Sequence, residues 1–298
     1  MPTAMLGDGA FLRDRTGVRF MFRHNPGGGE LGIEKARMAL AIQQEIDAGR
    51  GLADGTVLFD TRVLAPERLE SYVGHCRRLR AAGLEPALEA PRVRPAAHSV
   101  MGGIRVDASL HTAAPHLFAA GEAGGGVHGA SRLAGNGAAD VIVFGGIAGQ
   151  RAAAHAAKAP AASRDRARIE REALATLQGS SGGADAPRPD EIRDAVRATL
   201  LEGAGLYRTR TGLERAIARL EALAQAVGAG LAMRTPRDRL RALEAQNMVK
   251  TGLHVARSAL ERTESRGAHW RTDHAARDDA RWLRHVIVEA GSSRIAIQ

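Results

Sequence analysis

The sequence is poor in aromatic residues and has almost no cysteine. Aromatic side chains make up 3% of the 298 residues, which leaves few rings to stack on nucleic-acid bases. Cys76 is the single cysteine, so the chain can form neither an internal disulfide nor a cysteine metal cluster, and we expect no metal site. No segment approaches the ~20 apolar residues of a membrane span, and the first residues lack the regions of a signal peptide. These absences predict a cytoplasmic protein.

Lysine is also scarce, although the chain is basic. The net charge of +9 is carried almost wholly by arginine, since the only lysines are Lys35, Lys158 and Lys250. Arginines alternate with acidic residues in segments such as 164–172, a pattern typical of solvated helix faces. A nucleic-acid binder therefore remains only a minor alternative.

Patterning along the first third predicts mixed short elements. We expect a hairpin over 7–22, an amphipathic helix over 30–48, a strand over 56–60, a helix over 66–82, and extended segments at 91–98 and 101–107. Cys76 falls on the apolar face of the 66–82 helix, so we interpret it as a buried side chain rather than a reactive thiol.

The rest of the chain is predicted to be mostly helical. A short apolar strand at 115–120 leads into a glycine-rich loop, which becomes an apolar helix from about Gly137 to 157. Two stretches rich in helix-breaking residues, on either side of one charged helix, indicate a linker over 159–189. Apolar stripes near 190–203, 210–229 and 237–263 predict a small antiparallel bundle. The patterns thus separate a mixed part before the linker from a helical domain over 190–298.

The glycine-rich loop after residue 120 holds three chemically distinct polar residues, Glu122, His128 and Arg132. Glycines allow a ligand to approach the backbone closely. A helix that begins just after the loop presents free N–H groups and the positive end of its dipole. Although such turns can simply be tight packing, the polar residues favour an anion-binding site.

His98 and Arg132 both lie on glycine-flanked loops and form a candidate carboxylate clamp. A guanidinium binds a carboxylate bidentately and an imidazole adds a further donor. Lys35, Arg37 and Arg19 are additional cations in the first segment. The alternative interpretation is a loop histidine and a surface arginine with no ligand.

Several ordered motifs resemble the flavoprotein subunit family of succinate dehydrogenase, fumarate reductase and L-aspartate oxidase. The motifs are GDGAFL (7–12), GVRFM (17–21), PAAHSVMGGI (95–104), LFAAGEA (117–123), VHGASRLAGN (127–136), VFGGIAG (143–149), GLYRTRTGLERA (205–216), TESRGAH (263–269) and DDARWLRH (278–285). The resemblance covers nearly the whole chain. It implies an α/β plus α fold, in which a partial FAD-binding domain with a capping segment precedes an all-α helical bundle. The implied domains are the capping (substrate) segment (1–97), the flavin-side half of the FAD-binding domain (98–158), the linker (159–189) and the C-terminal helical domain (190–298).

The resemblance also implies roles for individual residues. Glu122 would hold the ribose or ribityl part of FAD. The loop from Arg132 through Asn136 would approach the isoalloxazine ring, with the N–H groups of Gly137 and Ala138 facing its N1–C2=O edge.

The substrate of such an enzyme would be a small dicarboxylate. His98 and Arg132 would bind it, in agreement with the clamp inferred from the residues. Lys35 aligns with the family's proton-donating arginine, and this replacement places succinate or fumarate chemistry in question.

The family's dinucleotide-binding fingerprint, GxGxxG after a strand, has no counterpart in this chain. We therefore expect a truncated protein that binds FAD weakly unless a separate N-terminal polypeptide completes the fold. An iron–sulfur subunit is a second expected partner, and it would bring the protein to the periphery of the inner membrane. The alternatives are an inactive fragment that serves as an interaction module, and L-aspartate oxidase-like activity.

Overall fold

The computed structural model describes residues 2–133, 135–159, 165–178, 182–183, 185–289 and 295–297. The chain divides into two compact units, residues 1–99 and 100–298. Parts of the predicted linker lie outside the described residues. The predicted boundaries inside the second unit stay predictions.

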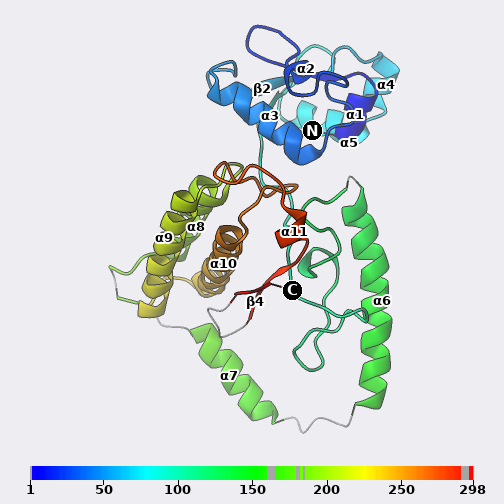
Figure 1. The fold of residues 1–298 in the computed structure, drawn as a ribbon. Coiled ribbons are helices and arrows are strands. Elements are labelled where there is room, and N and C mark those ends of the chain that lie inside the picture. Colours follow the sequence, from blue (N-terminus) through cyan, green and yellow to red (C-terminus); the bar gives the residue numbers. More distant parts are fainter. Residues whose placement is uncertain are drawn as a thin grey trace. The chain divides into compact units, whose positions relative to one another are not determined.

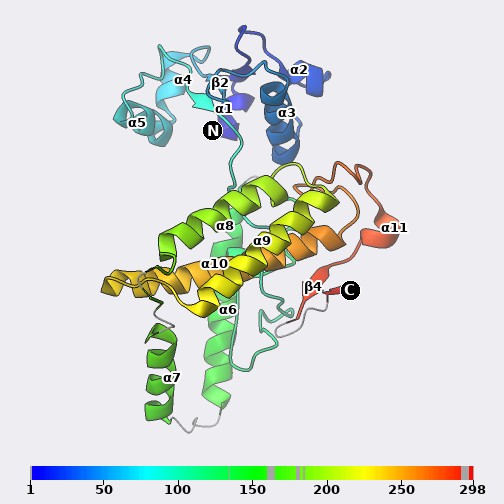
Figure 2. The same ribbon diagram turned by 90° about the vertical axis from the view of Figure 1, so that its left-hand side faces the viewer.

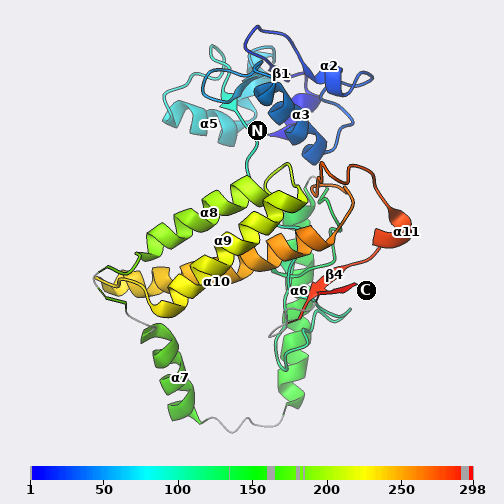
Figure 3. The ribbon, with the colours of Figure 1, turned by 60° about the vertical axis from the view of Figure 1, so that its left-hand side comes forward.

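The first unit combines a small antiparallel sheet with short helices (Figure 1). The strands β1 (Phe11–Arg13), β2 (Val57–Asp60) and β3 (Arg92–Val93) lie in the order β1-β2-β3. The helices are α1 (Thr3–Gly7), α2 (Met21–His24), α3 (Lys35–Asp47), α4 (Pro66–Glu70) and α5 (Val73–Ala81). Figure 3 shows α3 next to α2.

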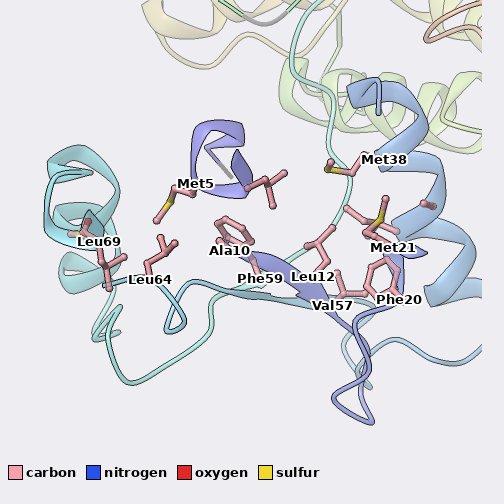
Figure 4. Close-up of a cluster of buried hydrophobic side chains, with 14 residues drawn as sticks. Met5, Ala10, Leu12, Phe20, Met21, Met38, Val57, Phe59, Leu64 and Leu69 are labelled. Atoms are coloured by element: carbon pink, nitrogen blue, oxygen red, sulfur yellow. The ribbon is translucent and has the colours of Figure 1, made fainter. Parts of the chain in front are cut away.

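One apolar cluster forms the core of this unit (Figure 4). Leu12 of β1 and Phe59 of β2 are fully buried and meet Met5 of α1 and Met38 of α3 in the same cluster. Cys76 joins it at 1% exposure, and its thiol donates to the Leu69 carbonyl at 3.2 Å. Burial raises the pKa of that thiol. The interpretation of Cys76 as a buried side chain is confirmed.

Three local predictions for this unit were wrong. The hairpin over 7–22 is reduced to a single bridge between Arg13 and Arg19, because β1 pairs with β2 instead. The helix predicted from Glu30 begins at Lys35, since the Asn25 side chain binds two carbonyls and holds the preceding segment as turns. The helix over 66–82 is split into α4 and α5.

A buried carboxylate organises the polar side of α3. Glu45 is fully buried and contacts Arg23 at 2.5 Å, Arg50 at 2.6 Å and His24 at 2.8 Å. Burial alone would raise the pKa of Glu45, but hydrogen bonds from Arg50 and His24 and the charge of Arg23 outweigh it and lower that pKa to about 2. The carboxylate therefore ties α2 and the segment after α3 to the helix.

The second unit is mainly helical. Its elements are the 3₁₀ turn η1 (Gly121–Ala123), α6 (Asn136–Lys158), α7 (Arg166–Gln178), α8 (Pro189–Ala204), α9 (Arg210–Ala229), α10 (Pro236–Glu261), α11 (Asp279–Trp282), and the antiparallel pair β4 (Val286–Val288) and β5 (Ile295–Ile297). Strands predicted at 101–107 and 115–120 are present only as isolated bridges. Within the described residues, no helix combines the length and apolarity required to cross a membrane.

The predicted bundle is confirmed, because α8, α9 and α10 pack side by side (Figure 2). Val196, Leu220 and Val249, one from each helix, meet in its core. Caps fix the helix starts: the Thr209 hydroxyl accepts the Gly212 N–H at 3.0 Å, and a capping box opens α10 at Thr235. The short connections between these helices make neighbours antiparallel.

A polar segment after α10 folds back on that helix. Arg271 is fully buried and donates to the carbonyls of Ala259, Leu260 and Arg262 at 3.1 Å each, which satisfies the free end of α10. His269 donates from Nε2 to the Arg262 carbonyl and accepts from Arg208 at Nδ1. Burial and the positive charge of Arg208 lower the pKa of His269 to about 4.

Candidate functional site

The glycine-rich loop is built on close backbone contacts. Ile104 N–H donates to the Ala123 carbonyl at 2.8 Å, and Gly125 N–H donates to the Ile104 carbonyl at 2.9 Å. A Cβ on Gly103 would lie 2.6 Å from the Ala123 oxygen, so only glycine permits this approach. The Met-Gly-Gly turn is thereby fixed against the start of the loop.

Glu122 lies in η1 and is exposed. Its Oε1 accepts the N–H of Val100 at 2.8 Å. One carboxylate oxygen therefore stabilises the segment that follows His98 in the chain. The other can accept a hydrogen bond from a hydroxyl of a bound ligand, as binding of the ribose or ribityl part of FAD requires.

The N-terminus of α6 is a candidate anion-binding site. Its N-cap, Gly135, has φ +85° and provides no side-chain cap, and the first turn carries no acidic residue. Ala138 N–H donates to the Gly135 carbonyl at 3.2 Å, so this predicted flavin contact is shared with the turn. The positive end of the α6 dipole is not neutralised by an acidic residue of its own first turn.

Arg132 adds a cation at the same place. If Gly137 carried a Cβ, that atom would lie 3.1 Å from Cζ of Arg132, so the guanidinium rests on the first turn of α6. A positive charge at a helix N-terminus is unfavourable by itself. Together, the guanidinium and the helix start favour binding of an anion.

His128 is the loop's third polar residue, and the structure gives it a structural contact. Its Nε2 donates to Oδ2 of Asp140 at 3.1 Å, and Asp140 is 5% exposed. The other carboxylate oxygen of Asp140 is buried without a hydrogen-bond partner. The pair ties the loop to the second turn of α6, a role that the sequence did not indicate.

The polar segment after α10 holds the loop at another point. Ala268 N–H donates to the Ala130 carbonyl at 2.9 Å, and a Cβ on Gly267 would lie 2.5 Å from that oxygen. Sequence reasoning missed this contact, although the density of polar residues around TESRGAH was a signal. The helical domain thus supports the loop that carries Arg132.

The predicted site residues fall in both units. Glu122, Arg132 and the α6 start at residues 136–138 all belong to the second unit and occupy one short segment. Lys35 is exposed at the first position of α3, and His98 is exposed in the loop after β3, both in the first unit. The carboxylate clamp formed by His98 and Arg132, and the role of Lys35, stay predictions.

Comparisons with known proteins place these features in one family. Residues 1–138 match the model of an FAD binding domain, and residues 193–298 match that of the fumarate reductase flavoprotein C-terminus. One of the subunits of the CoM/CoB fumarate reductase from Methanothermobacter marburgensis is 38% identical over 91% of this chain and 49% of its own length. The L-aspartate oxidase of Streptomyces coelicolor is 35% identical over 98% of this chain and 49% of its own.

A solved structure of the same family has the same fold. A mutant of the E. coli quinol fumarate reductase superposes with a TM-score of 0.89 at 30% identity, covering 100% of this chain and 55% of that one. Fold and site define a flavoprotein with a helical C-terminal domain. More closely, the chain belongs to the family of fumarate reductase and succinate dehydrogenase flavoprotein subunits and L-aspartate oxidase, whose cofactor is FAD. It spans about half the length of the curated relatives it matches.

The residues present fit the flavin side of that cofactor. Gly126, Gly129 and Gly135 have positive φ and nothing within 4 Å of the position of a Cβ, so a flat ring can approach the backbone of the loop. The α6 start and Arg132 suit the edge on which a reduced flavin gathers negative charge.

Proposed function

We propose that the chain is the flavin-side part of an FAD-dependent oxidoreductase that acts on a small dicarboxylate. The observation that carries the proposal is the Arg132 guanidinium resting on Gly137 at the start of α6. This arrangement offers one substrate carboxylate a bidentate cation beside the ring-binding loop. FAD, when bound, supplies the hydride acceptor or donor.

The chain's own residues then have separate tasks. Arg132 and His98 orient the substrate by its carboxylates, and Lys35 exchanges the proton at the carbon next to the one that exchanges hydride. Glu122 accepts a hydrogen bond from a hydroxyl of the cofactor. Asn136 lies beside the ring, and Gly137 and Ala138 present N–H groups to its electron-rich edge.

The surface of α6 supports a partner that completes the cofactor domain. Val141, Ile142 and Val143 are 57%, 74% and 53% exposed, so α6 presents apolar side chains around much of its circumference there, as a helix covered by a partner does. We infer that a polypeptide carrying the family's dinucleotide-binding half covers this surface and supplies the pyrophosphate cradle. An iron–sulfur subunit that accepts electrons, and through it a peripheral membrane location, belong to the same proposal.

Measurements of flavin binding test whether a second polypeptide completes the cofactor domain. The purified chain alone should bind FAD weakly, and addition of a dinucleotide-binding half from a family member should give stoichiometric flavin absorbance near 450 nm. Ile142→Asp should prevent this gain, whereas Lys158→Gln, at the far end of the same helix, should not. Tight FAD binding by the chain alone, or no gain on addition of the half, would contradict the inference.

Turnover tests the substrate. With the cofactor domain completed, we expect succinate oxidation or fumarate reduction that Arg132→Ala abolishes and Arg105→Ala, an exposed arginine of the same unit, leaves intact. Because L-aspartate oxidase is among the similar relatives, L-aspartate is assayed in parallel. Flavin bound at full occupancy without turnover of any dicarboxylate would instead indicate the inactive-module alternative, which Lys35 favours.

A further inference from the structure

Three histidines lie close together where the loop that precedes η1 meets α6: His111 and His116 belong to that loop and His155 belongs to α6. His116 Nδ1 and His155 Nε2 lie 2.7 Å apart and share a hydrogen bond. The ring centroids of His111 and His155 are 5.7 Å apart. The rings of His111 and His155 border an open cavity of about 270 Å³. Its lining residues are Ser109, His111, Phe118, Arg151 and His155.

The backbone of the loop is held in an unusual conformation around this cavity. Among the described residues, only Leu110 and His116 are non-glycine residues with positive φ, at +62° and +63°. Such conformations cost about 1–2 kcal/mol each. The Asp107 carboxylate fixes the turn by accepting the N–H groups of Ser109 and His111. Strain of this kind is often retained where side chains must be placed for binding.

The polar groups that line the cavity can all donate hydrogen bonds. Nε2 of His111 is buried and has no hydrogen-bond partner. Arg151 brings a permanent positive charge, and Ser109 brings a hydroxyl. The nearby Asp107 oxygen Oδ1 is already bound to backbone N–H groups. Within the described part of the chain, no three His, Cys, Asp or Glu side chains are grouped as a metal site requires.

We propose that this cavity binds a phosphoryl oxyanion, with Arg151 and the imidazoles of His111 and His155 as its donors. The cavity is large and open enough to admit a phosphate group, and a guanidinium beside several N–H donors is the chemistry that recognises one. The site lies on the C-terminal half of α6, apart from the loop that carries Arg132, so it does not depend on the proposed flavin chemistry.

Imidazole ¹⁵N resonances of the full chain, titrated with inorganic phosphate, test the proposal. Chloride at matched ionic strength is the reference, and a parallel titration with ADP distinguishes free phosphate from a phosphate ester. We expect saturable shifts at His111 and His155 with phosphate, with ADP, or with both. Arg151→Gln should weaken binding about tenfold, the loss of one charge-assisted hydrogen bond.

Lys250→Gln, which removes an exposed cation from α10, is the matched control and should leave the affinity unchanged. Ser109→Ala should weaken binding without loss of charge. Equal responses to phosphate, ADP and chloride would overturn the proposal. An affinity that falls equally in Arg151→Gln and Lys250→Gln would also overturn it, because it would indicate attraction by net charge alone.

Discussion

Glu45→Gln should destabilise the first unit strongly, because it removes a buried negative charge that three basic side chains surround. The pKa of Glu45 is lowered from 4.5 to about 2. At 1.36 kcal/mol per pKa unit this corresponds to about 3 kcal/mol. Arg23 and Arg50 are about 40% exposed, so solvent screens part of the interaction and we expect a loss of about 2–3 kcal/mol.

The lowered pKa of Glu45 also sets how the stability of the first unit depends on pH. The folded-state pKa of Glu45 lies below its unfolded value, so its contribution is present above about pH 4.5 and is lost as the pH falls towards 2. The substitution should remove that part of the acid sensitivity.

Hydrogen exchange of the α3 amides in urea at pH 7 measures the stability loss, and far-UV circular dichroism at decreasing pH measures the acid sensitivity. Asp47→Asn, which changes an exposed carboxylate on the same helix, is the control. If the α3 amides are as well protected from exchange in Glu45→Gln as in Asp47→Asn, the stability loss derived from the pKa is wrong.

Two further predictions concern the second unit. Gly267→Ala places a Cβ at φ +56°, 2.5 Å from the Ala130 carbonyl oxygen, so it should destabilise the fold by more than the ~1 kcal/mol of a left-handed residue and speed hydrogen exchange over residues 127–133. The control Gly228→Ala, in open space on α9, should do neither, and equal exchange in the two variants would refute the support of the loop by residues 267–268. The pKa of His269 is lowered from 6.5 to about 4, so the free energy of unfolding should be undiminished above pH 6.5 and fall by up to about 3 kcal/mol as the pH drops to 4. Tryptophan fluorescence in urea would measure it, and a pH dependence that His269→Gln leaves unchanged would assign the effect to another group.

Sequence patterning alone determined the helical half of the protein. The stripes that predicted helices near 190–203, 210–229 and 237–263 correspond to α8, α9 and α10 within a few residues, because a helix of 16 residues or more repeats its apolar face often enough to be recognised. The burial of Cys76 followed from the same periodicity. The motifs, being local, also indicated the family and the loop that carries Arg132.

Only the tertiary structure decided which distant segments meet. Strand β1 pairs with β2 rather than with the residues after its own turn, since strands of three and four residues carry too little pattern to specify a partner. The contacts of His128 with Asp140 and of Ala268 with Ala130 join residues that have no shared periodicity. Hydrogen bonds and close approaches of this kind depend on where the whole chain places its loops, and so the support of the candidate site could be found only in three dimensions.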